Sequence, residues 1–142
     1  MNVATILKAK GADVETVGPD ITLGEVARLL SAKRIGAVLV LEGEHLIGIL
    51  SERDVIKSIG VAGSEALDRR VREVMTSRIV TCDLNDSVDL LMDMMTEGRF
   101  RHLPVVAEGR LVGIISIGDV VKHRMAETVM ETEALRLYIA NS

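Results

Sequence analysis

The sequence contains the same motif twice, 65 positions apart, and this duplication constrains the fold more than any other feature. Residues 48–54 read Gly-Ile-Leu-Ser-Glu-Arg-Asp and residues 113–119 read Gly-Ile-Ile-Ser-Ile-Gly-Asp, so both fit Gly-apolar-apolar-Ser-x-x-Asp. The same offset relates Thr16 to Thr81 and Thr22 to Ser87. About forty residues on each side therefore belong to a repeat, and the function has to be sought in what two such modules form together.

Each copy predicts the order strand, helix, strand, strand, helix. The first helix begins at a capping box, Thr22 to Glu25. The interval from the helix cap to the next basic residues is two residues longer in the second copy, and its hairpin is two residues shorter, so we infer two compensating indels that align Ala37 with Pro104. The expected elements span 14–17, 22 onward, 37–41, 46–50 and 54–59 in the first copy, and 79–82, 87–98, 103–106, 111–116 and 119 onward in the second.

The sequence divides into four segments. These are an N-terminal segment with repeat 1 (1–62), a linker helix (63–76), repeat 2 (77–125) and a C-terminal helical extension (126–142). The apolar pattern after Asp119 outlasts its counterpart in the first copy. An amphipathic tail without a core of its own needs a partner surface, so we expect a homodimer.

Composition excludes several classes of protein. The net charge is −4 and the aromatic residues are Phe100 and Tyr138 alone, which disfavours nucleic acids and anionic membranes as partners. Cys82 is the single cysteine, so we expect a buried strand residue in a reducing compartment and no metal site. No apolar stretch is long enough to span a membrane, and the first residues do not read as a signal peptide, so a cytoplasmic protein is expected.

The chain resembles the paired cystathionine beta-synthase domain, the CBS or Bateman module. The resemblance rests on the two repeated motifs, on residues 101–106 (Arg-His-Leu-Pro-Val-Val) and on residues 74–76 (Val-Met-Thr), and it covers residues 10–125 or so. It implies an α/β fold of tandem CBS repeats, two β-α-β-β-α units with pseudo-twofold symmetry and two clefts between them. It also implies a non-catalytic regulatory module, often homodimeric, that binds AMP, ATP or NAD(H), needs no obligatory cofactor and acts on an unidentified protein.

The repeated motif places a serine at the end of a strand and an aspartate at the start of a helix, where the helix dipole favours anions. Each aspartate either caps its own helix or offers its carboxylate to a ribose diol. The resemblance assigns Asp54 and Asp119 to the ribose and Ser51 and Ser116 to the adjacent hydroxyl.

Basic residues near the same strand supply phosphate contacts in this interpretation. The further candidates are Lys33, Arg34 and Arg53 in the first copy, Arg99, Arg101, His102 and Pro104 in the second, and Thr16 and Thr81 on the strands that would read the adenine edge. We expect unequal sites, with the second tighter for a nucleoside monophosphate, because Gly118 leaves room beside Asp119 where Arg53 would crowd the ligand. A longer phosphate chain could reverse that order through the charge of Arg53.

Two other functions compete with nucleotide sensing. A hydrolase built from Ser116, His102 and Asp119 lacks a nucleophile elbow, and the first copy has no histidine matching His102. No phosphate-binding Walker sequence is present. The remaining alternative is a homodimeric protein-interaction scaffold with no physiological nucleotide ligand.

Overall fold

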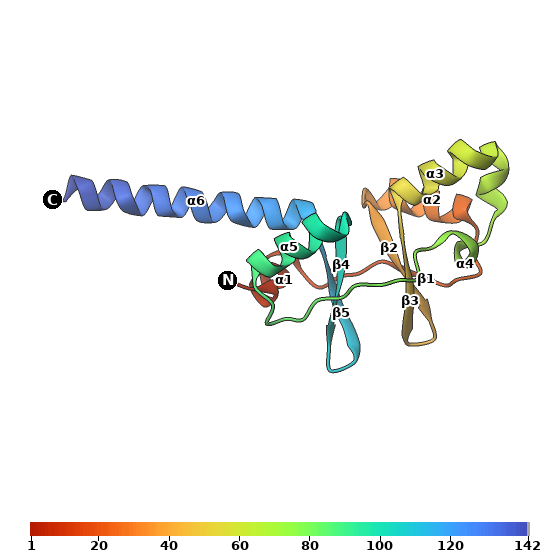
Figure 1. Ribbon diagram of the computed structural model, residues 1–142, viewed down its shortest axis with the longest axis horizontal. Coiled ribbons are helices and arrows are strands. Elements are labelled where there is room, and N and C mark those ends of the chain that lie inside the picture. Colours follow the sequence, from red (N-terminus) through yellow and green to blue (C-terminus); the bar gives the residue numbers. More distant parts are fainter. Residues whose placement is uncertain (142) are drawn as a thin grey trace. The chain divides into compact units, whose positions relative to one another are not determined.

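The computed structural model describes residues 1–141, which form two compact units of helices and strands (Figure 1). The first-repeat unit comprises residues 13–80, and the second-repeat unit comprises residues 1–12 together with the chain from residue 81. The mixture of helices with antiparallel and parallel strand pairs confirms the predicted α/β class. Residue 142, the last of the predicted extension, lies outside the described residues.

The first-repeat unit contains a three-stranded sheet in the order β1-β2-β3. Its elements are β1 (Thr16–Val17), α2 (Leu23–Lys33), β2 (Ala37–Glu42), β3 (His45–Ser51), α3 (Glu52–Ala62), the 3₁₀ helix η1 (Gly63–Asp68) and α4 (Val71–Val74). β1 runs parallel to β2, and β2 pairs antiparallel with β3. The core joins α2 to the sheet through Leu23, Val26, Val38, Val40 and Leu50.

The second-repeat unit is built on the β4-β5 hairpin. Its elements are α1 (Val3–Lys10), α5 (Val88–Gly98), β4 (His102–Ala107), β5 (Arg110–Ser116) and α6 (Ile117–Ala140). Its core includes Leu91, Leu103, Val105 and Ile115. The predicted last helix and C-terminal extension are one continuous helix, α6, of 24 residues.

The inferred indels are wrong. α2 and α5 both have 11 residues, and the strands of the two hairpins have matching lengths, so the 65-residue offset holds throughout. Arg34 and Arg99, at φ 55° and 54°, are equivalent left-handed residues that end the two helices. Ala37 therefore aligns with His102 and Leu39 with Pro104. The basic residues in the sequence were a poorer marker of the alignment than the helix ends.

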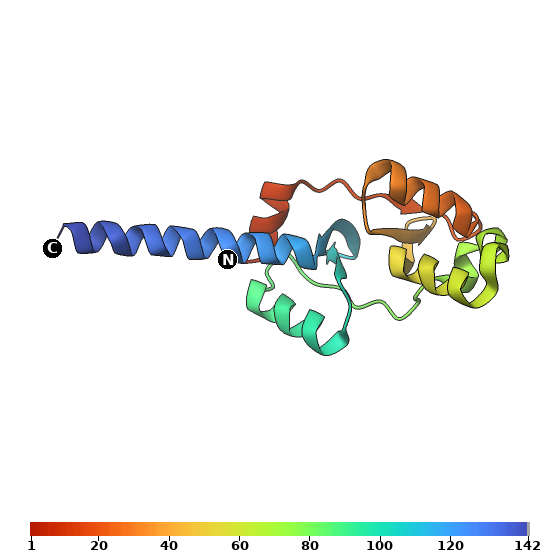
Figure 2. The same cartoon turned by 90° about the horizontal axis from the view of Figure 1, so that it is seen from above.

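Each unit is completed by a short leading segment that precedes the other repeat in sequence. The amide of Val3 donates to Asp86 O at 2.9 Å, and the amide of Val71 donates to Ile21 O at 2.9 Å, which is the equivalent place in the other unit. Both valines are fully buried. Residues 1–10, with α1 beside α6 in Figures 1 and 2, thus belong to the second-repeat unit, and residues 69–76 belong to the first.

This arrangement corrects two of the predicted segments. Residues 1–12 do not pack with the first repeat, because their apolar side chains enter the core of the second. Residues 63–76 are not one helix: η1 and α4 are separated at Arg69 and Arg70, both extended there, which lets Val71 reach the core. The two leading segments also explain two glycines, because a Cβ at Gly48 would clash with Met75 and one at Gly113 would lie 2.7 Å from Leu7 Cδ2.

The strand predicted at residues 79–82 is reduced to a single bridge between Cys82 and Val105. In the first-repeat unit the equivalent strand is held by a bond from the Leu39 amide to Glu15 O at 3.1 Å. Pro104 occupies the place of Leu39 and has no N–H to donate. The loss of that one donor accounts for the shorter pairing.

Candidate functional site

The two predicted Ser-x-x-Asp motifs form two capping boxes of the same geometry. Ser51 caps α3: its Oγ accepts from the Asp54 amide at 3.3 Å, and Asp54 Oδ2 accepts from the Ser51 amide at 2.9 Å. Ser116 caps α6 in the same way, at 3.2 Å and 2.8 Å. The interpretation of the aspartates as helix caps is therefore confirmed. Each capped terminus also holds a half-buried carboxylate at the positive end of a helix.

Asp119 has a cationic partner, Lys10, that the repeated motif does not predict. Lys10 Nζ lies 2.6 Å from Asp119 Oδ2 and also donates to Ile114 O at 2.7 Å. Burial raises the pKa of Asp119, but the hydrogen bonds from Lys10 and Ser116 more than offset this and hold the pKa below its ordinary value. Lys10 is 109 positions from Asp119 and lies outside the repeated motif, so no spacing pattern could have indicated it.

Asp54 lies in a different environment. The Ser51 hydroxyl donates to Asp54 Oδ2 at 3.1 Å, in addition to the backbone bond. Among residues 1–141 no basic side chain forms an ion pair with Asp54, and the neighbouring Arg53 is exposed. The same motif thus carries a paired carboxylate in one unit and an unpaired carboxylate in the other.

The first-repeat unit has a hollow of about 470 Å³ between α2 and α3. It is lined by Ala27, Leu30, Ser31, Arg34, Ile35, Gly36, Glu52, Val55 and Ile56. Of the candidate residues, Arg34 alone lines it; Ser51 and Asp54 do not. The hollow therefore does not enclose the carboxylate that would bind a ribose.

Two other candidates of the first repeat lie near β1, the edge strand of its sheet. Thr16 is exposed in β1, opposite Leu39 of β2. Lys33 ends α2, and its Nζ is 3.8 Å from Glu15 Oε1, in the residue directly before β1. The structure brings Thr16 and Lys33 to the same end of the unit.

The candidates of the second repeat surround the hairpin. His102 pairs with Ser116 across β4 and β5, and Pro104 is buried opposite Ile114. Arg101 is exposed, and its carbonyl accepts from the Ile117 amide at 2.8 Å, which joins the strand to the start of α6. Thr81 is exposed immediately before the Cys82 bridge. Arg101 and His102 thus lie beside the capped terminus that holds Asp119.

Cys82 is buried, as predicted, with 4% of its surface exposed. Burial raises the pKa of its thiol to about 12, with smaller contributions from Asp86 and Asp83. Within residues 1–141 no group of three or more metal-ligating side chains comes together, and no helix is both long and apolar enough to cross a bilayer.

Comparison with known proteins identifies the repeats. The sequence model of the CBS domain matches residues 9–61 and 71–126, and so covers both copies of the motif. The chain belongs to the CBS domain family. A CBS domain-containing protein of Bacillus subtilis, YhcV, is 33% identical over 113 residues, which cover 80% of each chain. The mitochondrial CBS domain-containing protein CBSX3 of Arabidopsis thaliana is 30% identical over 146 residues, covering 96% of this chain and 71% of the relative.

Solved structures agree with this assignment. The CBS-domain protein ATU1752 of Agrobacterium tumefaciens has a TM-score of 0.86 and 49% identity, and the match covers 87% of this chain and 99% of that one. The CBS domain pair of MJ0100, 22% identical with a TM-score of 0.79, was solved with 5-methylthioadenosine and S-adenosyl-L-methionine. CBS pairs are regulatory modules, and some of them bind adenosine-derived ligands.

Proposed function

We propose that this CBS pair is a non-catalytic regulatory module that binds an adenine nucleotide, AMP, ATP or NAD(H). The observation that carries the proposal is the duplicated capping box, which holds a carboxylate at a helix N-terminus in each unit. A carboxylate accepts two hydrogen bonds from a vicinal diol, and helix amides attract phosphate. The adenosine-type ligands of MJ0100 support the same class of ligand here.

In this proposal, different residues bind different parts of the nucleotide. Asp119 and Asp54 accept from the ribose hydroxyls. Arg101 and His102 face the phosphate in the second-repeat unit, where Lys10 adds a further cation beside Asp119. Arg53 takes that role in the first-repeat unit. We expect AMP to bind more tightly at the second-repeat unit, because three basic residues lie near one phosphate there and Gly118 adds no side chain.

Calorimetry on ligand-stripped protein tests this directly, with AMP, ADP, ATP, NAD, NADH and S-adenosylmethionine. Asp119→Asn is the matched variant, because the amide oxygen of asparagine can still accept the hydrogen bond from the Ser116 amide while the charge is removed. We expect it to weaken AMP binding about tenfold to a hundredfold, and Asp54→Asn to weaken it less. No binding of any of these ligands at millimolar concentration would overturn the proposal.

We also propose that the protein is a homodimer. The support is the set of exposed apolar side chains on α6, among them Met125, Leu135 and Tyr138, each more than half exposed. Residues 1–141 of one chain leave these side chains exposed, and a closed twofold dimer is the commonest assembly that buries such a surface. Light scattering at micromolar concentration should give twice the chain mass of 15.4 kDa; the mass of one chain would contradict the dimer.

The alternative function is a homodimeric scaffold that binds a protein and no nucleotide. One observation favours it: both motif aspartates are already used as helix caps, and Asp119 also pairs with Lys10. In a scaffold, Asp119→Asn would change the stability of the protein and leave its interactions intact. The same calorimetric series therefore separates the two functions.

A further inference from the structure

The C-terminal helix carries a row of side chains with coiled-coil spacing. Positions 121, 125, 128, 132, 135 and 139 follow one another at intervals of four and three, and they hold Val, Met, Thr, Thr, Leu and Ile; we name this row the α6 seam. Every residue from Thr128 to Asn141 is exposed. In both views α6 continues well beyond α1 and α5 of its own unit (Figures 1 and 2).

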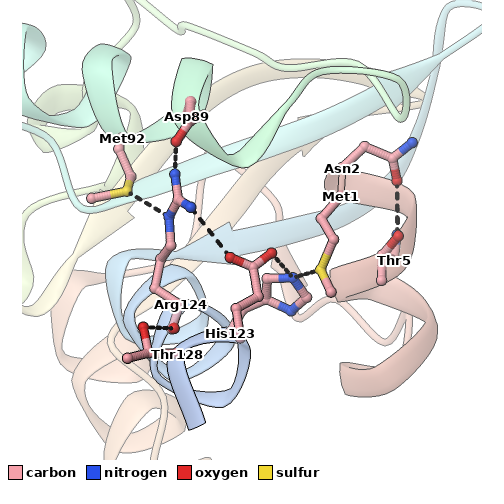
Figure 3. A network of polar contacts seen from close by, with 9 residues as sticks. Met1, Asn2, Thr5, Asp89, Met92, His123, Arg124 and Thr128 are labelled. Carbon is pink, nitrogen blue, oxygen red and sulfur yellow. Dashed lines mark hydrogen bonds and ion pairs between the residues drawn. The ribbon is translucent and has the colours of Figure 1, made fainter. Parts of the chain in front are cut away.

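The helix is anchored to its own unit by residues beside and behind this row. Arg124 pairs with Asp89 at the start of α5 and donates to Met92 Sδ at 3.4 Å. His123 contacts Met1 and lies 3.4 Å from Glu127 (Figure 3). At about 100° per residue, His123 and Glu127 point well away from the seam, whereas Arg124 flanks it. The apolar seam side chains stay exposed beside these contacts: Val121 by 49%, Met125 by 65%, Leu135 by 58% and Ile139 by 63%.

The hydroxyl groups of the two threonines in the middle of the seam already donate hydrogen bonds within α6. Thr128 Oγ1 donates to Arg124 O at 3.1 Å, and Thr132 Oγ1 donates to Thr128 O at 2.9 Å. Each hydroxyl therefore has its partner within α6 itself. A second apolar surface can cover these positions without leaving an unpaired hydroxyl donor.

We propose that the α6 seam binds the α6 seam of a second copy of this chain, with the two helices parallel and in register. The charges beside the seam select this direction. In a parallel pair, Glu131 lies opposite Arg136 of the second copy, five residues further along, and the symmetry of the dimer forms this contact twice. In the antiparallel alignment that stacks the seam, Glu131 would face Glu131, and Lys122 would face Arg136.

This inference rests on the proposed homodimer and adds its geometry; it does not depend on nucleotide binding. The opposite side of α6 offers a control, because Met130 and Leu137 are also exposed and apolar there. Leu135 and Leu137 are 58% and 65% exposed, so cysteines at the two positions are equally accessible in one chain. Only Leu135 lies in the seam.

Disulfide cross-linking of the full-length protein tests the proposal. Leu135→Cys should form a covalent dimer at least about tenfold faster than Leu137→Cys under mild oxidation, because parallel pairing brings the two 135 positions together. The native Cys82 is buried and does not compete. Equal rates at the two positions would overturn the choice of face. Faster cross-linking in a mixture of Met125→Cys with Leu135→Cys than in Leu135→Cys alone would overturn the parallel direction.

A charge exchange provides a second test that leaves the seam intact. Glu131→Arg and Arg136→Glu should each weaken the dimer about threefold or more, and the double variant should restore its dissociation constant. Unchanged dissociation constants in both single variants would contradict the parallel register. Light scattering distinguishes failure of the homodimer from failure of this inference. A monomeric wild type would contradict the homodimer itself. A dimer that does not cross-link at position 135 would contradict only the α6 pairing.

Discussion

The two units share a framework but differ in what surrounds it. Their equivalent helices, hairpin strands and capping boxes are separated in the sequence by one constant offset of 65 residues. Yet Asp119 pairs with Lys10, whereas the side-chain bonds of Asp54 within residues 1–141 are those of its own cap. The difference arises in the leading segments, which are not part of the duplicated motif. Both copies have thus kept the capped helix terminus with its carboxylate. The leading segment packed beside it gives the second copy an ion pair that the first copy does not show among residues 1–141.

The largest expected effect tests which leading segment packs into the core of which unit. Val3→Ala and Val71→Ala are matched variants, since both valines are fully buried at equivalent places. Each should lower the free energy of unfolding by about 2 kcal/mol. Hydrogen exchange should locate the effect of Val3→Ala in β4 and β5 and that of Val71→Ala in β2 and β3. Faster exchange in β2 after Val3→Ala would contradict the assignment of residues 1–12 to the second repeat.

A smaller effect should follow from removing the ion pair of the second-repeat unit. Lys10→Met should raise the pKa of Asp119 and cost about 1 kcal/mol or less at neutral pH, because both side chains are partly exposed. A carboxyl group whose pKa is lower in the folded protein than in the unfolded chain stabilises the folded state at any pH above its unfolded-state pKa. This contribution disappears as the pH falls through the lowered pKa of the folded state. The difference between wild type and variant should therefore shrink in acid.

Chemical denaturation between pH 3 and pH 7 measures this difference, and Lys8→Met serves as the control. Lys8 is exposed on the same helix and, among residues 1–141, forms no ion pair. The Lys8→Met substitution changes the net charge by the same amount as Lys10→Met. An equal pH dependence in the two variants would mean that general charge, and not the contact with Asp119, stabilises the unit.

The smallest effect concerns the strand that Pro104 shortens. Pro104→Ala restores an amide where Leu39 has one, so residue 104 should gain a hydrogen bond to the carbonyl of residue 80. The net change in stability should stay within about 1 kcal/mol, because the added bond is offset by a more flexible unfolded chain. Hydrogen exchange of the new amide is the sharper measurement. Exchange at the rate of an exposed amide would show that something other than the missing donor keeps the strand short.

Much of the fold was predictable because local signals agree with the packing. The capping boxes fix where the helices begin, and alternation with a glycine turn fixes the hairpins. In the candidate site, the capping boxes of Ser51 with Asp54 and of Ser116 with Asp119 were predictable, since their spacing is local. Lys10 was not, because its contact depends on how a segment 109 residues away packs. The indels were misjudged because basic residues on a surface carry no fixed position in a fold, whereas the left-handed ends of α2 and α5 do.

The crossing of the leading segments has a consequence for synthesis of the chain. Residues 13–80 contain every part of the first-repeat unit, so this unit can fold as soon as residue 80 has left the ribosome. The apolar side chains of α1, among them Ile6 and Leu7, find their partners only after the second hairpin has emerged. α1 is therefore synthesised before the first-repeat unit but packs after it, and until then its apolar face is exposed to chaperones and to other nascent chains.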